Sequence, residues 1–283
     1  MNTQPYDLPS LRIFVRTIAV FAALFAVHFN GIGQRGYIWS TTIQGSTSNE
    51  AGIDVDCDAS GAVFVAGDYG NNANFGGVPE PSWGNRDMFT CQFDPFGNFE
   101  WVHTEGNTVT DRTFAVRAGS DGHIYSAGYG LVIFPAHRVA MHAWDAVTMR
   151  LRPDGSLHWG WAMNGGGAMD FSEALDIAPD PFGNSYTVGV MKNDGWYATD
   201  TVYGIGAEDA FVVKFDSIGD FRWGKALGGV SDDQANGVDV GPDGHIWVGG
   251  SFRGTANFDA IPLNSGGNTD GFIAKIDSNG NVV

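Results

Sequence analysis

The sequence is poor in positive charge. Its 283 residues include only 15 Lys and Arg against 32 Asp and Glu, which gives a formal net charge of -17. The cations stand singly along the chain, whereas a nucleic-acid-binding surface needs a basic patch to meet the phosphates. We therefore expect no nucleic acid partner. The acidic balance is typical of a solvated extracellular surface, and attraction of divalent cations is the alternative interpretation.

The sequence also lacks an apolar run long enough to span a membrane. Residues 17–29 (TIAVFAALFAVHF) fall short of the ~20 residues that a spanning helix needs, but they match the apolar region of a signal peptide. Arg12 and Arg16 precede the run, and Gly31 and Gly33 allow cleavage before Gln34. The sequence predicts a signal peptide at residues 1–33 and a secreted or cell-surface protein with no stable membrane span after processing. An uncleaved N-terminal membrane anchor is the alternative.

Glycine is abundant, with 41 residues, and it marks a repeat. The segments GAVFVAG, GHIYSAG, GNSYTVG and GHIWVGG begin at residues 61, 122, 183 and 244, which is one copy every 61 residues. Each copy is a turn glycine followed by a short β-rich run. Because no Gly-X-Y triplet runs through the chain, the glycines are read as turn positions between many short strands.

The last copy predicts four strands, at residues 223–227, 237–240, 245–252 and 271–276. Residues 253–269, between the third and the fourth strand, carry a recurring pattern of their own and are predicted to form an extra small hairpin. Two residue types recur at fixed places. Tryptophans at 39, 101, 159 and 223 are predicted to pack between neighbouring units rather than to stack on a ligand. Aspartates at 87, 145, 209 and 270 are predicted to fix an incoming loop by accepting backbone hydrogen bonds.

A unit of about 61 residues with four antiparallel strands is the signature of a β-propeller blade. The prediction is an all-β fold, a β-propeller of about four such four-stranded blades. The blades run roughly over residues 46–104, 105–163, 164–227 and 228–283, within a repeat region of 34–283.

Residues 37–283 resemble a known family, the secreted bacterial β-propeller repeats called SBBP repeats. The resemblance rests on GHIWVGGSF, on GTANFDAIPLNSGGNTDGFIAKID and on the Asp-x-x-Gly-x-x-x-Trp hairpin, with residues 137–153 departing most from the pattern. The resemblance implies an exported or cell-surface propeller, usually without an enzymatic assignment.

The ends of the repeat region leave two ring arrangements open. In one, strand 37–44 completes the last blade and seals a four-bladed ring. In the other, the chain is a fragment of a larger propeller of six to eight blades, which we favour because the sequence ends within a half-made hairpin after Asp277.

Two local patterns invite a chemical interpretation. Asp54, Asp56 and Asp58 with Ser60 resemble the first half of a calcium loop, but the twelfth position is Gly67 rather than Glu, so a plain turn is expected. Overlaying the repeats places Cys57 opposite Val240, and Cys91 opposite Met149, Val213 and Ala274. Both cysteines are therefore predicted to be small core residues, with no disulfide between them.

The sequence contains no local signature of a nucleophilic triad and no cluster of histidines with metal-ligand spacing. We assign no catalytic, cofactor-binding or metal residues and no cofactor, and expect the protein not to be an enzyme. The predicted function is a binding or interaction scaffold for an unknown protein or glycan. The alternative is a glycan-binding, lectin-like module or a polysaccharide-active enzyme, using aromatics such as Trp83, Trp196 and Tyr197. Capping of the outer strands is the competing interpretation of those rings.

Overall fold

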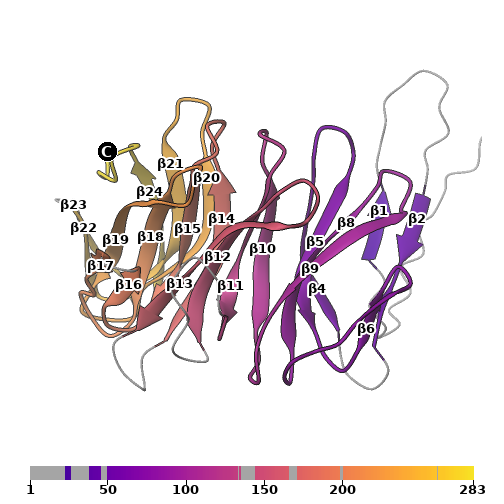
Figure 1. Ribbon diagram of the computed structural model, residues 1–283. Helices are drawn as coiled ribbons and strands as arrows, with labels where there is room; N and C mark the ends of the chain where they lie inside the picture. Colours follow the sequence, from indigo (N-terminus) through magenta and orange to yellow (C-terminus); the bar gives the residue numbers. More distant parts are fainter. Residues whose placement is uncertain are drawn as a thin grey trace, which may run out of the picture.

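The computed structural model describes residues 23–26, 38–45, 50–132, 134, 144–165, 171–197, 200–259 and 261–283. These residues form antiparallel sheets and contain no helix, so the all-β prediction is confirmed (Figure 1). The expected signal peptide lies outside the described residues except for strand β1 (Ala23–Ala26).

Most of the strands belong to four units that follow one another along the chain, each with its strands hydrogen-bonded in chain order. Unit 1 contains β4 (Ala51–Cys57), β5 (Val63–Tyr69), β8 (Asp87–Phe93) and β9 (Phe99–Glu105); unit 2 contains β10 (Arg112–Ala118), β11 (Ile124–Gly130), β12 (Asp145–Leu151) and β13 (Leu157–Gly165); unit 3 contains β14 (Ser172–Pro179), β15 (Ser185–Met191), β18 (Asp209–Phe215) and β19 (Phe221–Gly229); unit 4 contains β20 (Gln234–Val240), β21 (Ile246–Phe252) and β24 (Asp270–Ile276).

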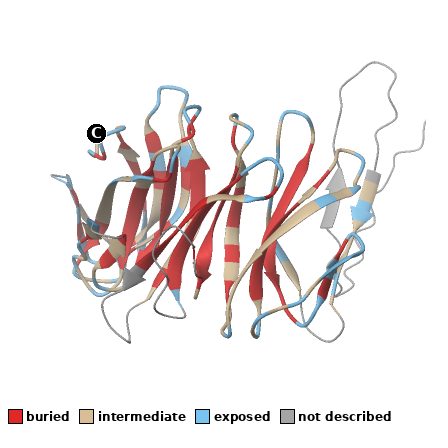
Figure 2. Cartoon of the chain, viewed as in Figure 1, coloured by how far each residue is buried: buried red, intermediate tan, exposed pale blue. Residues whose placement is uncertain are grey.

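The hydrophobic core lies between the units. In β5, β11, β12 and β15 every residue is buried (Figure 2). Neighbouring units cover both faces of β11, β12 and β15, whereas β5 packs against unit 2 on one face and against Trp39, Ile43 and Phe75 on the other. One cluster joins Tyr186 and Val212 of unit 3 to Val238 and Ile246 of unit 4. Since a sheet with two apolar faces cannot be stable alone in water, stacking of consecutive units supplies the burial.

One arginine forms ion pairs that link the first strands of units 1 to 3. Arg117 on β10 donates to Asp54 on β4, at 2.5 Å, and to Asp176 on β14, at 2.7 Å. The same two carboxylates accept backbone N–H groups of the following unit, at 3.0 Å from Val116 and 2.9 Å from Val238. Electrostatic contacts therefore add to the apolar packing between first strands.

Three further hairpins lie between the second and third strands of their units. They are β6 (Ala73–Phe75) with β7 (Val78–Glu80), β16 (Gly195–Tyr197) with β17 (Asp200–Val202), and β22 (Thr255–Phe258) with β23 (Ile261–Asn264). The last confirms the hairpin predicted within 253–269. The second and third hairpins pair with the outer strand of the preceding unit, β13 and β19. Each of these two hairpins thus extends the sheet of the preceding unit. Residues 135–143 of unit 2 lie outside the described residues.

The N-terminal strands do not pair as they would in the four-bladed ring considered above. Strand β2 (Ile38–Thr41) pairs with β1, and β3 (Ile43–Gln44) pairs with β6 of unit 1. The indole Nε1 of Trp39 donates to the carbonyl of Pro95, at 3.2 Å, in the last turn of unit 1. These contacts are those of an outer strand that precedes unit 1, so in the described residues this segment does not pair with β24.

Candidate functional site

Eight short turns gather on one side of the molecule, which we call the turn face. Four join the first strand to the second (58–61, 119–122, 180–183 and 241–244), three join the third to the fourth (94–97, 152–155 and 216–219), and the last follows β24 of unit 4 (277–280). Because neighbouring strands are antiparallel, both sets lie at the same end of the sheets, along the upper side of Figure 1. In every turn the glycine N–H donates to the carbonyl three residues earlier, at 2.9–3.0 Å.

The recurring tryptophans dock on this face. Trp101 of unit 1 donates from Nε1 to the carbonyl of Pro153 in unit 2, at 3.0 Å, and Trp223 of unit 3 donates to Ser278 of unit 4, at 3.1 Å. A Cβ at Gly155 would lie 2.5 Å from the Trp101 ring, so only glycine admits the indole there. Packing between units, as predicted from the sequence, is confirmed.

A cation lies over an aromatic ring at the same place in three units. Arg150 is 5.4 Å from the centroid of Tyr125, Lys214 is 5.2 Å from Tyr186, and Lys275 is 5.3 Å from Trp247. These rings are the aromatic residues of the repeated glycine motif. Such contacts hold the cations against the turn face and leave their donors directed at nearby carbonyls and carboxylates.

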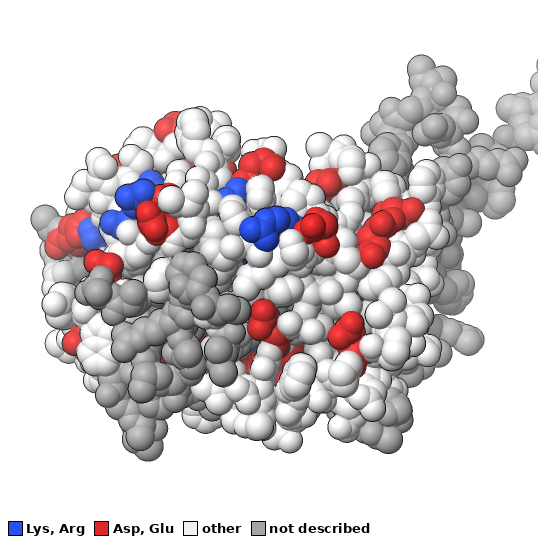
Figure 3. Space-filling model, viewed as in Figure 1, with Lys and Arg blue, Asp and Glu red and all other residues white. Residues whose placement is uncertain are grey.

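Arg150 and Lys214 also link consecutive units. Arg150 donates to Asp121 of its own unit, at 2.6 Å, and to the carbonyl of Ser217 in unit 3. Lys214 donates to the carbonyl of Ser278 in unit 4, at 3.2 Å. Figure 3 shows the Lys and Arg side chains of this view along its upper part, among Asp and Glu. Arg150 and Lys214, two of the few cations in the chain, thus link consecutive units.

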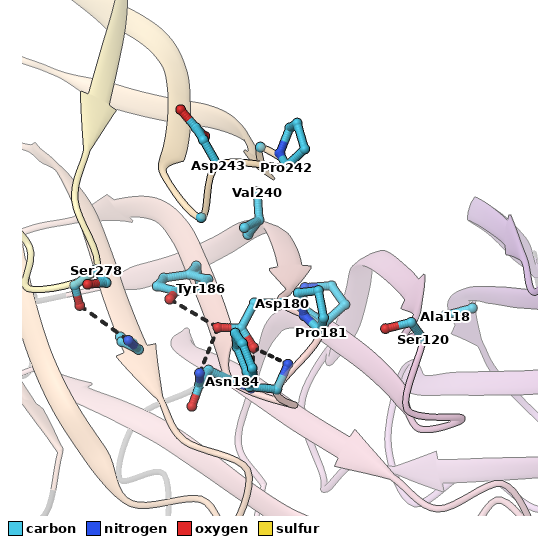
Figure 4. A pocket seen from close by; sticks show the side chains of 15 residues that line it. Ala118, Ser120, Asp180, Pro181, Asn184, Tyr186, Val240, Pro242, Asp243 and Ser278 are labelled. Carbon is cyan, nitrogen blue, oxygen red and sulfur yellow. Dashed lines mark hydrogen bonds between the residues drawn. The ribbon is translucent and has the colours of Figure 1, made fainter.

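A cavity of about 690 Å³ opens on the turn face between units 3 and 4, with Ala118 and Ser120 of unit 2 at its edge. Figure 4 shows Asp180 at its centre, surrounded by its hydrogen-bond donors. Asp180 accepts from the backbone N–H of Phe182, at 2.9 Å, and from the side chains of Asn184, at 2.6 Å, and Tyr186, at 3.3 Å. This carboxylate therefore shapes the floor of the cavity.

The cavity combines an apolar rim with a few polar groups. Phe182 stands 83% exposed beside Pro181, and Pro242 lies across from them on the turn of unit 4. Burial lowers the pKa of Lys214, although the nearby Asp180 raises it, and burial raises the pKa of Tyr186. An opening of this size, lined by both apolar and polar side chains and with an exposed ring at its rim, can hold a small ligand or a segment of another chain.

The opposite side of the molecule carries what we call the anchored loops, which lead into the third strand of each unit. Asp87 accepts from the N–H of Trp83, Asp209 accepts from Ile205, at 2.8 Å, and Asp270 accepts from Gly266, at 2.7 Å. The predicted role of these aspartates in fixing the incoming loop is confirmed for these three residues. Burial raises the pKa of Asp87 to about 6, and hydrogen bonds from the loop only partly offset it.

The aromatics proposed for sugar stacking do not share one environment. Trp83 is 71% exposed, whereas Trp196 is half-buried on β16. Tyr197 is fully buried, with its ring 5.1 Å from Phe215 and 5.5 Å from Phe221. Tyr197 is therefore unable to stack on a sugar, because it fills the core between the β16–β17 hairpin and unit 3.

The residues of the calcium-like pattern point to different partners. Asp54 and Asp56 face unit 2, where Asp56 accepts the N–H of Ala118, at 2.8 Å. Asp58 accepts the N–H and hydroxyl of Ser60, at 2.9 and 2.6 Å, and so caps its own turn. Among the described residues there is no group of three or more His, Cys, Asp or Glu side chains able to share a metal ion.

The two cysteines have free thiols. Cys91 is buried in the core of unit 1, where burial raises the pKa of its thiol. Cys57, predicted to be a core residue, is exposed instead, because it ends the first strand of a unit whose outward side is only partly covered.

In the part of the chain that the structure describes, no helix has the length and apolarity needed to cross a membrane. Comparison with protein-family models and with curated proteins finds no match for this chain. The site must therefore be interpreted from its own geometry.

Sequence reasoning missed the turn-face cavity. Its lining comes from three units, so no local motif marks it. One signal was present: a basic residue stands next to last in the third strand of units 2, 3 and 4, at Arg150, Lys214 and Lys275. In a sequence with only 15 cations, that regularity indicates a shared structural role.

Proposed function

We propose that this chain is a non-enzymatic, exported β-propeller that serves as a binding scaffold, and that it is related to the secreted bacterial β-propeller repeats. The four units would be the blades. Their equal strand order, their packing through buried middle strands and the repeated docking of Trp on the next turn support this arrangement. Export is supported by the signal-like composition of residues 1–33.

The observation that carries a binding role is the cavity on the turn face. Phe182 projects into solvent at its rim, while the N–H of Phe182 is fixed by Asp180 and Gly183 supplies the turn. A rigid aromatic side chain beside prolines is the kind of anchor on which protein partners bind, because little conformational entropy is lost. The partner we propose is a segment of another protein.

Selection from a random-peptide phage library tests this proposal. Peptides enriched on residues 34–283 should bind Phe182→Ala at least about tenfold more weakly, a change of about 1.4 kcal/mol. Phe96→Ala is the matched control, since Phe96 is 62% exposed at the tip of another turn of the same face and does not line the cavity. Failure to enrich any peptide, or equal loss in the two variants, would refute the cavity as the binding site.

A glycan-binding role is the second candidate, and one observation favours it. The Trp83 ring is 71% exposed even though its backbone is held by a buried carboxylate. An exposed aromatic ring offers a flat apolar face on which a sugar ring can stack.

A further inference from the structure

Three consecutive units each expose one large aromatic ring shortly before their third strand. Trp83 of unit 1 is 71% exposed, Trp144 of unit 2 is 56% exposed, and Tyr203 of unit 3 is 71% exposed. All three precede the third strand of their unit, which begins at Asp87, Asp145 or Asp209, so they lie at the end of the sheets opposite to the turn face. The corresponding loop of unit 4, at residues 265–269, is SGGNT and has no aromatic residue.

Backbone contacts hold the residues that carry these rings, or that adjoin them. The N–H of Trp83 donates to Asp87, and the carbonyl of Trp144 accepts from the N–H of Ser172, at 2.8 Å. Next to Tyr203, the N–H of Gly204 donates to Asp194, at 2.8 Å. Rings on fixed backbones lose little freedom when they bind, which favours association.

Two of the loops also pack closely against their own unit, at the end of its fourth strand or just after it. A Cβ at Gly84, beside Trp83, would lie 2.1 Å from the carbonyl oxygen of Asn107, and one at Gly206 would lie 2.2 Å from that of Gly229. Both glycines stand three residues before the loop aspartate, so the same close approach recurs in units 1 and 3. The backbone near Trp83 and near Tyr203 is therefore closely packed within its own unit.

We propose that this face binds an extended neutral polysaccharide, whose sugar rings stack on Trp83, Trp144 and Tyr203. Sheets packed face to face lie about 10 Å apart, so an extended chain of several sugars is long enough to reach the loops of more than one unit. Aromatic rings offer flat apolar faces to the C–H faces of sugars.

Charge selects among polysaccharides. The chain has a net charge of -17, and Asp200 and Asp232 are exposed near the loops of units 3 and 4. Carboxylates accept hydrogen bonds from sugar hydroxyls, whereas they repel sulfated or uronic acid polymers. The proposal rests on the second candidate function and does not involve the turn-face cavity.

Affinity gel electrophoresis of residues 34–283 with soluble neutral polysaccharides (xylan, glucomannan, mixed-linkage glucan and hydroxyethyl cellulose) and with alginate tests the proposal. At least one neutral polymer should retard the protein, and alginate should not. Trp83→Ala and Tyr203→Ala should each weaken retardation about tenfold, a change of about 1.4 kcal/mol. The oligosaccharides of the bound polymer should gain affinity with length until they span three units.

Phe96→Ala is the matched control, because Phe96 is an exposed ring on the turn face. It should bind the polymer like the unmodified protein, and thermal melting should show that all variants remain folded. Retardation by no neutral polymer, or retardation that survives loss of Trp83 and Tyr203, overturns the proposal. Loss of polymer binding in Phe182→Ala would instead place the sugar in the turn-face cavity, so the two proposals fail separately.

Discussion

The turn face and the anchored-loop face use aspartate in opposite ways. On the turn face, hydrogen bonds from the side chain of Asn98 and from turn N–H groups lower the pKa of Asp94, and the same contacts from Asn281 lower the pKa of Asp277. On the other face, burial raises the pKa of Asp87 to about 6 and also raises the pKa of Asp209. Both sets recur with the repeat and both hold a chain reversal in place.

The difference follows from solvent access. The turn aspartates Asp94 and Asp277 stay in water, so they accept several N–H groups as anions at little cost in desolvation. The loop aspartates Asp87 and Asp209 are buried under the loops that they fix, so each N–H that they accept is offset by the loss of hydration. The short turns therefore depend on charge, whereas the anchored loops depend on the shape and hydrogen bonds of the carboxyl group.

The largest effect is expected where a turn glycine receives a tryptophan. Gly155→Ala places a methyl group 2.5 Å from the Trp101 ring at a residue with φ +81, and should lower the free energy of unfolding by about 2–4 kcal/mol. Urea unfolding followed by tryptophan fluorescence measures the change.

Gly244→Ala separates the two causes. Gly244 has φ +77 in an equivalent turn of unit 4, but a Cβ at this residue would meet nothing within 4 Å. The variant should therefore show only the backbone cost, about 1–2 kcal/mol. Equal losses in the two variants would show that the indole contact between units contributes nothing.

A smaller loss is expected from Asp121→Asn on the turn face. Burial alone would raise the pKa of Asp121, but hydrogen bonds from His123, Tyr125 and Arg150 lower it. The substitution weakens the contact with Arg150, which is nearly buried, and should cost about 1–3 kcal/mol at neutral pH.

The sign of the pH effect follows from that lowered pKa. The Asp121 carboxylate contributes stability above its ordinary pKa of about 3.9, and this contribution is lost as the pH falls through the folded-state pKa. The difference between Asp121→Asn and the unmodified protein, measured by urea unfolding, should therefore shrink in acid. A difference that stays constant down to about pH 3 would show that charge at this turn is unimportant.

The sequence was enough to predict the structural features that recur in each unit. Glycine spacing and strand patterning predicted the strands of the last copy and the β22–β23 hairpin, because these features depend on residues close in the chain. The Trp contacts join residues more than 50 positions apart, and they were predicted because Trp recurs with the repeat. The cavity and the Arg117 contacts depend on which residues of three units face each other. Tyr197 illustrates what the sequence could not predict. Its position in a long loop suggested exposure, but β16, which carries Tyr197, pairs with β13 of the preceding unit, and Tyr197 is buried.

The smallest effect, and the reverse sign, is expected from Asp87→Asn on the anchored-loop face. An amide oxygen still accepts the N–H of Trp83, while the buried charge is removed, so stability at neutral pH should change by less than about 1 kcal/mol or rise. With a folded-state pKa of about 6, above the ordinary 3.8, the carboxyl group contributes stability that is complete below 3.8 and is lost as the pH rises through about 6. A shift of that size corresponds to at most about 3 kcal/mol.

Asp87→Asn should therefore flatten the dependence of unfolding free energy on pH between about 4 and 6, whereas the control Asp94→Asn should leave it unchanged in that range. An unchanged slope in Asp87→Asn, or a loss as large as that of Asp121→Asn, would mean that the two faces hold their aspartates in the same way.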